Sequence, residues 1–164
     1  SCAVLEAGKV MCWGDNIEGQ LGVGTGGNKD IPTLVTGITT ATKIALGSDH
    51  SCAVLEDSKI KCWGSNGHGQ LGNDGNTGSY NTPVQVLGIT TATNVALGGD
   101  HSCALLMDAT VTCWGRNQWG QLGDGTTDQR NSPATMVNGI TTATDIALSH
   151  DHGCAVLVGG TVQC

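Results

Sequence analysis

CWGSNGHGQLG, residues 62–72, recurs with small changes as CWGDNIEGQLG at residues 12–22 and as CWGRNQWGQLG at residues 113–123. A second motif, SCAVLE at residues 1–6, returns at 51–56 and, altered, at 102–107 and 153–158. The copies lie 50 or 51 residues apart, and a fixed period of this length is typical of tandem repeat folds. The chain therefore divides into three units, residues 1–50, 51–101 and 102–152, and a partial fourth, residues 153–164, that holds only a hairpin.

Short alternating apolar runs separated by Gly, Asn and Asp predict strands and hairpins in each unit. In the first unit, residues 3–5 and 9–13 flank a turn at residues 6–8. A third strand is expected at residues 43–46 and its copies, and a fourth at residues 33–35, 83–86 and 134–137. The sequence thus predicts an all-β fold of tandem four-stranded antiparallel blades of the β-propeller type. About three and a quarter units are present, so the ring is expected to be incomplete.

Eight cysteines fall in four pairs, and the two members of each pair lie ten positions apart across a predicted turn. Residues equidistant from a hairpin turn face each other at a Cβ separation that suits a disulfide. The pairs are Cys2 with Cys12, Cys52 with Cys62, Cys103 with Cys113, and Cys154 with Cys164. We expect four intra-hairpin disulfides, each contributing roughly 2.5 to 3 kcal/mol in the chain-entropy model. Because structural disulfides persist outside the cytosol, an extracellular or periplasmic location is expected, either secreted or on the cell surface.

Metal and cofactor sites find little support in the sequence. The cysteines lack the Cys-x-x-Cys spacing of a zinc knuckle. The Asn- and Asp-rich residues 73–78 and 124–128 could offer oxygen ligands to calcium, but such residues also make turns, and the order of an EF-hand loop is missing. Residues 24–27 lack the Lys-Ser/Thr ending of a phosphate loop. We expect no metal and no cofactor, with calcium as the alternative for the two Asn- and Asp-rich stretches.

Each unit resembles the repeat of the regulator of chromosome condensation family. The resemblance rests on Gly47, His50, residues 63–72 and Pro83 in one passage, and it returns with His101, Trp114 to Gly123 and Pro133 in the next. It covers essentially the whole chain and implies a β-propeller, usually of seven blades in that family, that binds through exposed loops. The family does not require the paired cysteines. Three and a fraction units cannot close a seven-bladed ring, so we expect a longer native chain or assembly with other chains.

Overall charge and hydropathy restrict the partners. The formal net charge of −7 argues against nucleic acid, because a phosphate backbone would be repelled. No apolar run approaches the roughly 20 residues that cross a bilayer, so no membrane-spanning segment is expected. The remaining class of partner is protein, through self-assembly or a surface partner.

In-phase His and Trp residues favour structural roles over catalysis. His50, His101 and His152 follow an Asp at the same repeat position, and we expect each to tie a turn to the neighbouring blade. Adjacent Asp, His and Ser on a strand point to opposite faces and cannot form a catalytic triad. The in-phase Trp13, Trp63 and Trp114 are expected to pack between blades. With no non-repeated nucleophile, acid and base together, the chain is predicted not to be an enzyme.

Positions that vary between otherwise similar units are the best candidates for partner contact, because the scaffold does not fix them. They lie between the Trp-Gly and Gly-Gln-Leu-Gly motifs, where Trp119 is the one Trp out of phase and, like Arg116, is a residue type that anchors interfaces. Local packing within the blade is the competing interpretation. The candidates are Ile17, Glu18, His68, Arg116, Gln118 and Trp119.

The leading functional hypothesis is an extracytoplasmic repeat scaffold that acts through protein–protein contacts. It would serve as a surface adhesive or as a building block of an extracellular assembly or fibre, with sheet edges covered by neighbouring chains. The alternative is a secreted propeller inhibitor or binding module, as in the secreted β-lactamase inhibitor of this repeat family. It would present one loop-rich face to a target enzyme or receptor.

Overall fold

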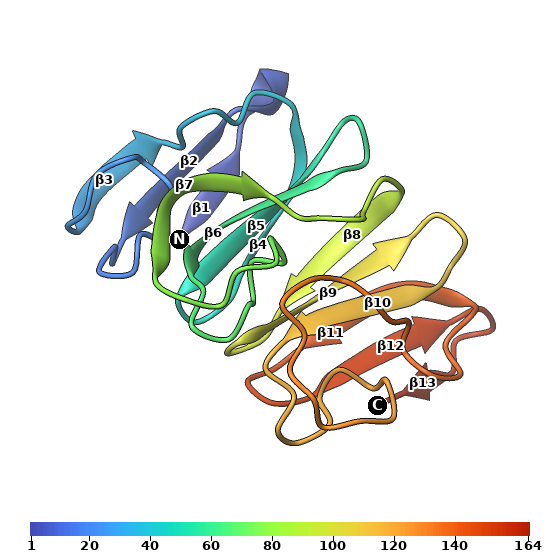
Figure 1. Ribbon diagram of the computed structural model, residues 1–164. Helices are drawn as coiled ribbons and strands as arrows, with labels where there is room; N and C mark the ends of the chain where they lie inside the picture. Colours follow the sequence, from blue (N-terminus) through green and yellow to red (C-terminus); the bar gives the residue numbers. More distant parts are fainter.

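The computed structural model describes all residues from 1 to 164 and contains four antiparallel β-sheets arranged side by side (Figure 1). The first sheet has the order β1-β2-β3, the second β4-β5-β6-β7, the third β10-β9-β8 and the fourth β11-β12-β13. The strands are β1 Cys2–Val4, β2 Val10–Gly14, β3 Lys29–Leu34, β4 Ala41–Leu46, β5 His50–Leu55, β6 Ile60–Ser65, β7 Ser79–Gln85, β8 Ala92–Leu97, β9 His101–Leu106, β10 Val111–Gly115, β11 Ala143–Leu148, β12 Gly153–Leu157 and β13 Val162–Gln163. A single 3-10 turn, η1 Glu6–Gly8, joins β1 to β2. No helix here could cross a membrane, because none combines the necessary length with the necessary apolar character.

The sheets are out of phase with the sequence units. Strands β4, β8 and β11 come from the end of one unit and pair with the first strand of the next, so that the second, third and fourth sheets each draw on two consecutive units. The first sheet comes from the first unit alone. The shared sheets link the units by backbone hydrogen bonds as well as by packing. Tandem blades of three or four strands, incomplete as a ring, are thus the architecture of this chain.

The prediction of a fourth strand is confirmed for the first two units and is wrong for the third. Strands β3 and β7 contain or adjoin the predicted residues 33–35 and 83–86. Residues 134–137 form no strand, and only the isolated bridges Thr112 to Met136 and Gly115 to Arg130 remain. β-Branching is retained here, because Thr135 stands where the other units have Thr33 and Val84. The Thr135 hydroxyl donates to Asp124 in the preceding loop at 3.3 Å, a contact that Thr33 and Val84 do not make.

Four disulfides join directly opposed residues of neighbouring strands: Cys2–Cys12, Cys52–Cys62, Cys103–Cys113 and Cys154–Cys164. In the registers of the first three sheets the paired cysteines are cross-strand partners, and the Cα atoms of every bridge are 4.1 Å apart. No free cysteine remains. The two-residue period of the strands turns the first three bridges toward the following sheet, where their sulfur atoms join the core.

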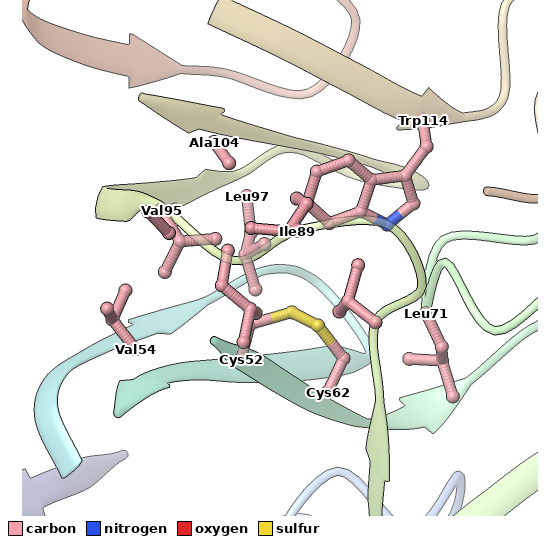
Figure 2. Packing of buried hydrophobic residues seen from close by; sticks show 12 residues of the cluster. Cys52, Val54, Cys62, Leu71, Ile89, Val95, Leu97, Ala104 and Trp114 are labelled. Carbon is pink, nitrogen blue, oxygen red and sulfur yellow. A yellow bond between two sulfur atoms is a disulfide. The ribbon is translucent and has the colours of Figure 1, made fainter. Parts of the chain in front are cut away.

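The hydrophobic core lies between the sheets rather than within any one of them. Three clusters fill the three seams, and the largest, between the second and third sheets, packs Val54, Ile60 and the Cys52–Cys62 bridge against Trp114 (Figure 2). Trp63 and Trp114 are fully buried, which confirms the expected packing between blades. Trp13 is only half-buried, because no sheet of this chain packs against its side of the first sheet.

Candidate functional site

One end of the sheets collects the long loops of the chain, and we call it the loop face. Antiparallel pairing brings the β2–β3, β6–β7 and β10 loops to the same end as the short turns that precede β5, β9 and β12. Figure 1 shows these segments along the lower edge of the sheets. The loop face comprises residues 15–28, 47–49, 66–78, 98–100, 116–129 and 149–152. All six candidate partner residues therefore lie on it.

A buried Asn organises each long loop, a role that the sequence interpretation did not assign. The side chains of Asn16, Asn66 and Asn117 are at most 1% exposed. Their Oδ1 atoms accept the backbone N–H of the Leu five residues later at 3.0 to 3.1 Å. Their Nδ2 atoms donate back into the same loop, for example to the Thr25 carbonyl at 2.8 Å. The sequence offered one signal for this role, because the Asn lies three residues after the Trp in all three units.

Adjacent sheets are joined at the loop face through the carbonyl of the Gln in each Gly-Gln-Leu-Gly motif. The Gln20 carbonyl accepts Trp63 Nε1–H at 2.9 Å and the Ser51 hydroxyl at 2.7 Å, both from the next sheet. The Gln70 carbonyl accepts Trp114 Nε1–H at 2.9 Å and the Ser102 hydroxyl at 2.8 Å. These paired bonds orient each Trp ring in its seam and satisfy a polar group at the edge of the core.

The in-phase histidines behave differently from one another. His50 Nε2 lies 3.0 Å from Ser102 Oγ in the next sheet, which confirms the expected tie between blades. Because the Ser102 hydroxyl donates to Gln70, His50 Nε2–H is the donor in this pair. His101 is fully buried, yet neither ring nitrogen has a partner, because Gly153 occupies the position that corresponds to Ser102. His152 is exposed and makes no such tie.

Both buried rings are held in the neutral form. Burial, followed by repulsion from His101, lowers the pKa of His50 from 6.5 to about 3. Burial also lowers the pKa of His101 to about 4, although Asp151 and Asp100 oppose this effect. Neutral, buried rings fit packing between blades and do not fit a general base poised near neutral pH.

Restoring the missing hydroxyl should stabilise the seam between the third and fourth sheets. We expect Gly153→Ser to raise the free energy of unfolding by about 0.5 to 1 kcal/mol, since a new hydrogen bond to His101 Nε2 satisfies a buried polar group. The added Cβ would lie 2.4 Å from Leu148 Cδ2, so this flexible side-chain end has to turn away, while the Ala147 carbonyl at 3.7 Å is an ordinary contact. Urea denaturation followed by circular dichroism measures the change. Ser102→Gly is the matched control and should destabilise by about 1 kcal/mol, and a loss of stability in both variants would contradict the assignment.

Of the candidate partner residues, two reach the next sheet. Glu18 accepts a hydrogen bond from the Ser79 hydroxyl, and His68 Nδ1 lies 3.4 Å from Gln129 Oε1. Trp119 occupies the equivalent position in the third unit but is 71% exposed. The series therefore supports local packing for its first two members. Each contacts a residue 61 positions later, and the corresponding position for Trp119 lies beyond residue 164.

The remaining candidates divide in the same way. Arg116 Nη1 pairs with Asp100 at 3.3 Å, and His68 Nε2 lies 3.9 Å from the same carboxylate, so the structure brings these two candidates together. Ile17 is 77% exposed and Gln118 is also exposed, each at a loop tip. Partner contact by these residues stays a prediction.

Charge is unevenly distributed over the loop face. Partial burial, together with the neighbouring carboxylates of Glu18, Asp100 and Asp15, raises the pKa of Asp49. No cation pairs with the acidic end formed by Asp15, Glu18 and Asp49, whereas Arg116 and Arg130 pair with Asp100 and Asp124. Any partner of the acidic end must therefore supply positive or hydrogen-bond-donating groups.

Residues 124–128 of the third loop were the alternative calcium site. In the structure the positive charge beside Asp124 is the guanidinium of Arg130. Arg130 Nη2 lies 2.9 Å from Asp124 Oδ2, and Thr126 donates to Asp124 Oδ1 through both its hydroxyl and its N–H. Burial alone would raise the pKa of Asp124, but these bonds outweigh it and hold the pKa well below its usual range. No group of three or more His, Cys, Asp or Glu side chains is arranged to hold a metal. The polar side chains of this loop therefore bond to one another, as in an ordinary turn.

Four stacked antiparallel sheets, with Trp and Ser donors on a Gln carbonyl at two of the three seams, define a tandem propeller-blade protein. The model of the regulator of chromosome condensation (RCC1) repeat matches residues 7–54, 61–105 and 108–156, and the chain belongs to this family. A second RCC1 repeat model matches residues 41–70 and 92–121.

Known relatives include proteins of diverse activity. The ultraviolet-B receptor UVR8 of Arabidopsis thaliana is 30% identical over 137 residues, covering 81% of this chain and 31% of the receptor. The probable E3 ubiquitin-protein ligase HERC4 of Homo sapiens is 34% identical over 160 residues, covering 94% of this chain and 15% of the ligase. This chain thus spans at most about a third of the curated relatives it matches.

Solved structures share the fold. Yeast RCC1 (Prp20) bound to Kap60 has a TM-score of 0.80 at 25% identity, covering 94% of this chain and 39% of that one. The ectodomain of the Physcomitrella patens receptor kinase CR4 has a TM-score of 0.60 at 21% identity, covering 99% of this chain and 37% of the ectodomain. The likeness to CR4 concerns the fold alone.

Proposed function

We propose that this chain is an extracytoplasmic scaffold that binds protein through its loop face, as a surface adhesive or a building block of an extracellular assembly. The observation that carries the proposal is the disulfide in every sheet together with the lack of any free thiol. Disulfides of this structural kind persist in oxidising compartments. The RCC1 fold is compatible with such a location, since the CR4 ectodomain has it.

Protein binding is supported by the loop face and by the family. Two large apolar side chains, Ile17 and Trp119, are more than two-thirds exposed on this face. Exposed apolar groups surrounded by polar loops are typical of interaction sites, and Trp is enriched among residues that dominate binding energy. Yeast RCC1, with the same fold, was solved in complex with the protein Kap60. The loop face provides no catalytic cluster, so binding is the activity that the geometry supports best.

The proposed location predicts the redox state of the protein in its native source. We expect alkylation without a reductant to label none of the eight cysteines, and labelling after denaturation and reduction to modify all eight. Mass spectrometry of rapidly quenched material measures both numbers. The reduced and denatured sample is the control for access of the reagent. Free paired thiols in quenched material would contradict an oxidising compartment.

The assembly proposal predicts concentration-dependent association under non-reducing conditions. Light scattering should give a mass that rises with concentration, and electron microscopy should show particles with a regular repeat. Replacing Ile17 and Trp119 by Ser should weaken the association at least tenfold, because both side chains belong to the proposed contact face.

Ile31→Ser is the matched control for the assembly experiment. Ile31 is 67% exposed, like the two target residues, but lies on β3 and outside the loop face. It should leave association unchanged. If the particle is compact and contains one chain at every concentration, the self-assembly proposal is wrong. That result would favour the inhibitor or binding-module alternative.

A further inference from the structure

The sequence contains two Asn-Gly pairs, Asn66–Gly67 and Asn138–Gly139, and the structure places them in opposite surroundings. Such a pair is chemically labile, because glycine has no side chain to hinder attack by its own backbone nitrogen on the carbon of the Asn amide. The chain therefore holds the same reactive motif once in a buried setting and once in an exposed one.

Asn66 is protected by its position in the second long loop. Its side chain is 0% exposed. Its Oδ1 accepts Leu71 N–H at 3.1 Å, and its Nδ2 donates to Asn73 Oδ1 at 3.0 Å. Attack on this amide would break both hydrogen bonds and would form charged intermediates away from water, which is costly.

Asn138 has no such protection. Asn138 and Gly139 are both exposed, in the turn that follows the third loop. No group of the chain hydrogen-bonds to the Asn138 side-chain amide, and Gly139 N–H donates to no carbonyl. The bond across the turn, from Ile140 N–H to the Val137 carbonyl, is long at 3.4 Å, so the turn can open at little cost. Both reacting groups are thus free and in contact with water.

Only the third unit has an Asn at this turn. The first and second units have Thr36–Gly37 and Leu87–Gly88 at the same position. The turn therefore does not require the Asn amide, and the first unit supplies a residue that keeps the turn without it.

We propose that Asn138 is a site of spontaneous covalent modification, in which the Gly139 backbone nitrogen attacks Asn138 Cγ. The nitrogen gives up its proton to solvent, the new N–C bond closes a succinimide ring, and the Cγ–Nδ2 bond breaks with release of ammonia. Water then opens the ring at either carbonyl and leaves aspartate or isoaspartate, and no atom is oxidised or reduced. The inference concerns one turn and does not depend on the proposed scaffold function.

The product places a new negative charge against the third loop. Asn138 Nδ2 lies over Gly125, since a Cβ on that glycine would be 2.9 Å from it. Asp124, the neighbour of Gly125, already carries a charge that Arg130 balances. Asn138 N–H also donates to the Gly123 carbonyl at 2.8 Å, and isoaspartate lengthens the backbone at this point by one methylene group. Modification should therefore loosen the contact between the turn and the third loop.

The test is incubation of the intact, oxidised chain at pH 8.5, followed by peptide mapping with tandem mass spectrometry. A mass gain of one dalton marks conversion of an Asn, whereas isomerisation of an Asp-Gly pair leaves the mass unchanged. We expect Asn138 to react roughly tenfold or more faster than Asn66, because only Asn66 must first break two hydrogen bonds. The rate at Asn138 should also rise with pH, since the attacking backbone nitrogen has to lose its proton.

Two controls complete the experiment. In the reduced and denatured chain both Asn-Gly pairs are open to water and should react at similar rates, which gives the reference for each site. Asn138→Thr introduces the residue of the first unit and should abolish the fast mass gain while leaving the reaction at Asn66 unchanged. If folding protects Asn138 as strongly as Asn66 relative to the denatured reference, or if the fast mass gain persists in Asn138→Thr, the proposal is wrong.

Discussion

Trp114→Ala should lower the free energy of unfolding by about 3 to 5 kcal/mol, among the largest effects expected of a single substitution in this chain. The indole is fully buried in the largest core cluster and its N–H donates to the Gln70 carbonyl at 2.9 Å. Truncation leaves a cavity between two sheets whose strands are joined to their own neighbours and cannot easily collapse into it. Urea unfolding at pH 7.5, followed by far-ultraviolet circular dichroism, measures the loss.

Two companion variants separate the ring from its hydrogen bond. Trp114→Phe keeps an aromatic ring but removes the N–H, and it should lose about 1 to 2 kcal/mol because the Gln70 carbonyl keeps only its bond from Ser102. Trp119→Ala removes the same side chain from a site that is 71% exposed and should change stability by less than about 0.5 kcal/mol. If Trp114→Ala and Trp119→Ala proved equally mild, seam packing could not be what holds the sheets together.

The sequence was sufficient for the fold because the repeat carries its own turns, strands and cysteine spacing. The hairpin containing Cys52 and Cys62 is fixed locally by alternation and by ten-residue spacing, so its register needed no tertiary information. Trp63 and Trp114 occupy the same position of the repeat, so both were expected to be buried in the same way, between neighbouring sheets, and both are.

Other features depend on pairs of units and were not visible one unit at a time. The fourth strand of the third sheet is reduced to isolated bridges where Thr135 donates to Asp124, a loop contact that the equivalent Thr33 and Val84 lack. The orphaned His101 results from Gly153, a residue 52 positions later, and only the offset seen in the His50–Ser102 pair reveals the connection. The candidate partner residues were chosen mainly by variation, and variation does not distinguish a loop residue that contacts the next blade, as at Glu18, from one that faces solvent, as at Ile17.

Acidification from pH 7.5 to 5 should lower the free energy of unfolding by roughly 2 to 4 kcal/mol through His50 and His101. The folded-state pKa values are about 3 and about 4, below the value of 6.5 expected in the unfolded chain. The unfolded state therefore binds more protons than the folded state between pH 6.5 and 4, and stability must fall as the pH decreases through this window. The contribution is fully present above about pH 7, where both rings are neutral in both states.

Several aspartates act in a lower pH range, so the window from pH 6.5 to 5 isolates the histidines. The pKa values of Asp124 and Asp151 are lowered by their hydrogen-bonded partners, and their stabilising effect is lost only at more acid pH. The raised pKa of Asp49 acts in the opposite direction, because protonation relieves the cost of its partial burial and its repulsion from Glu18 and Asp100.

The double variant His50→Gln and His101→Gln supplies the decisive comparison. Gln keeps an N–H donor near the His50 Nε2 position but does not titrate, so the difference in stability between pH 7.5 and 5 should fall by more than half. Urea midpoints at four pH values between 7.5 and 5, with the slope of the unfolding free energy checked at each, give the two curves. A wild-type curve that is flat across this range would mean that both rings take up a proton in the folded protein. The two seams would then have to open to water around His50 and His101, whereas the structure has both side chains fully enclosed.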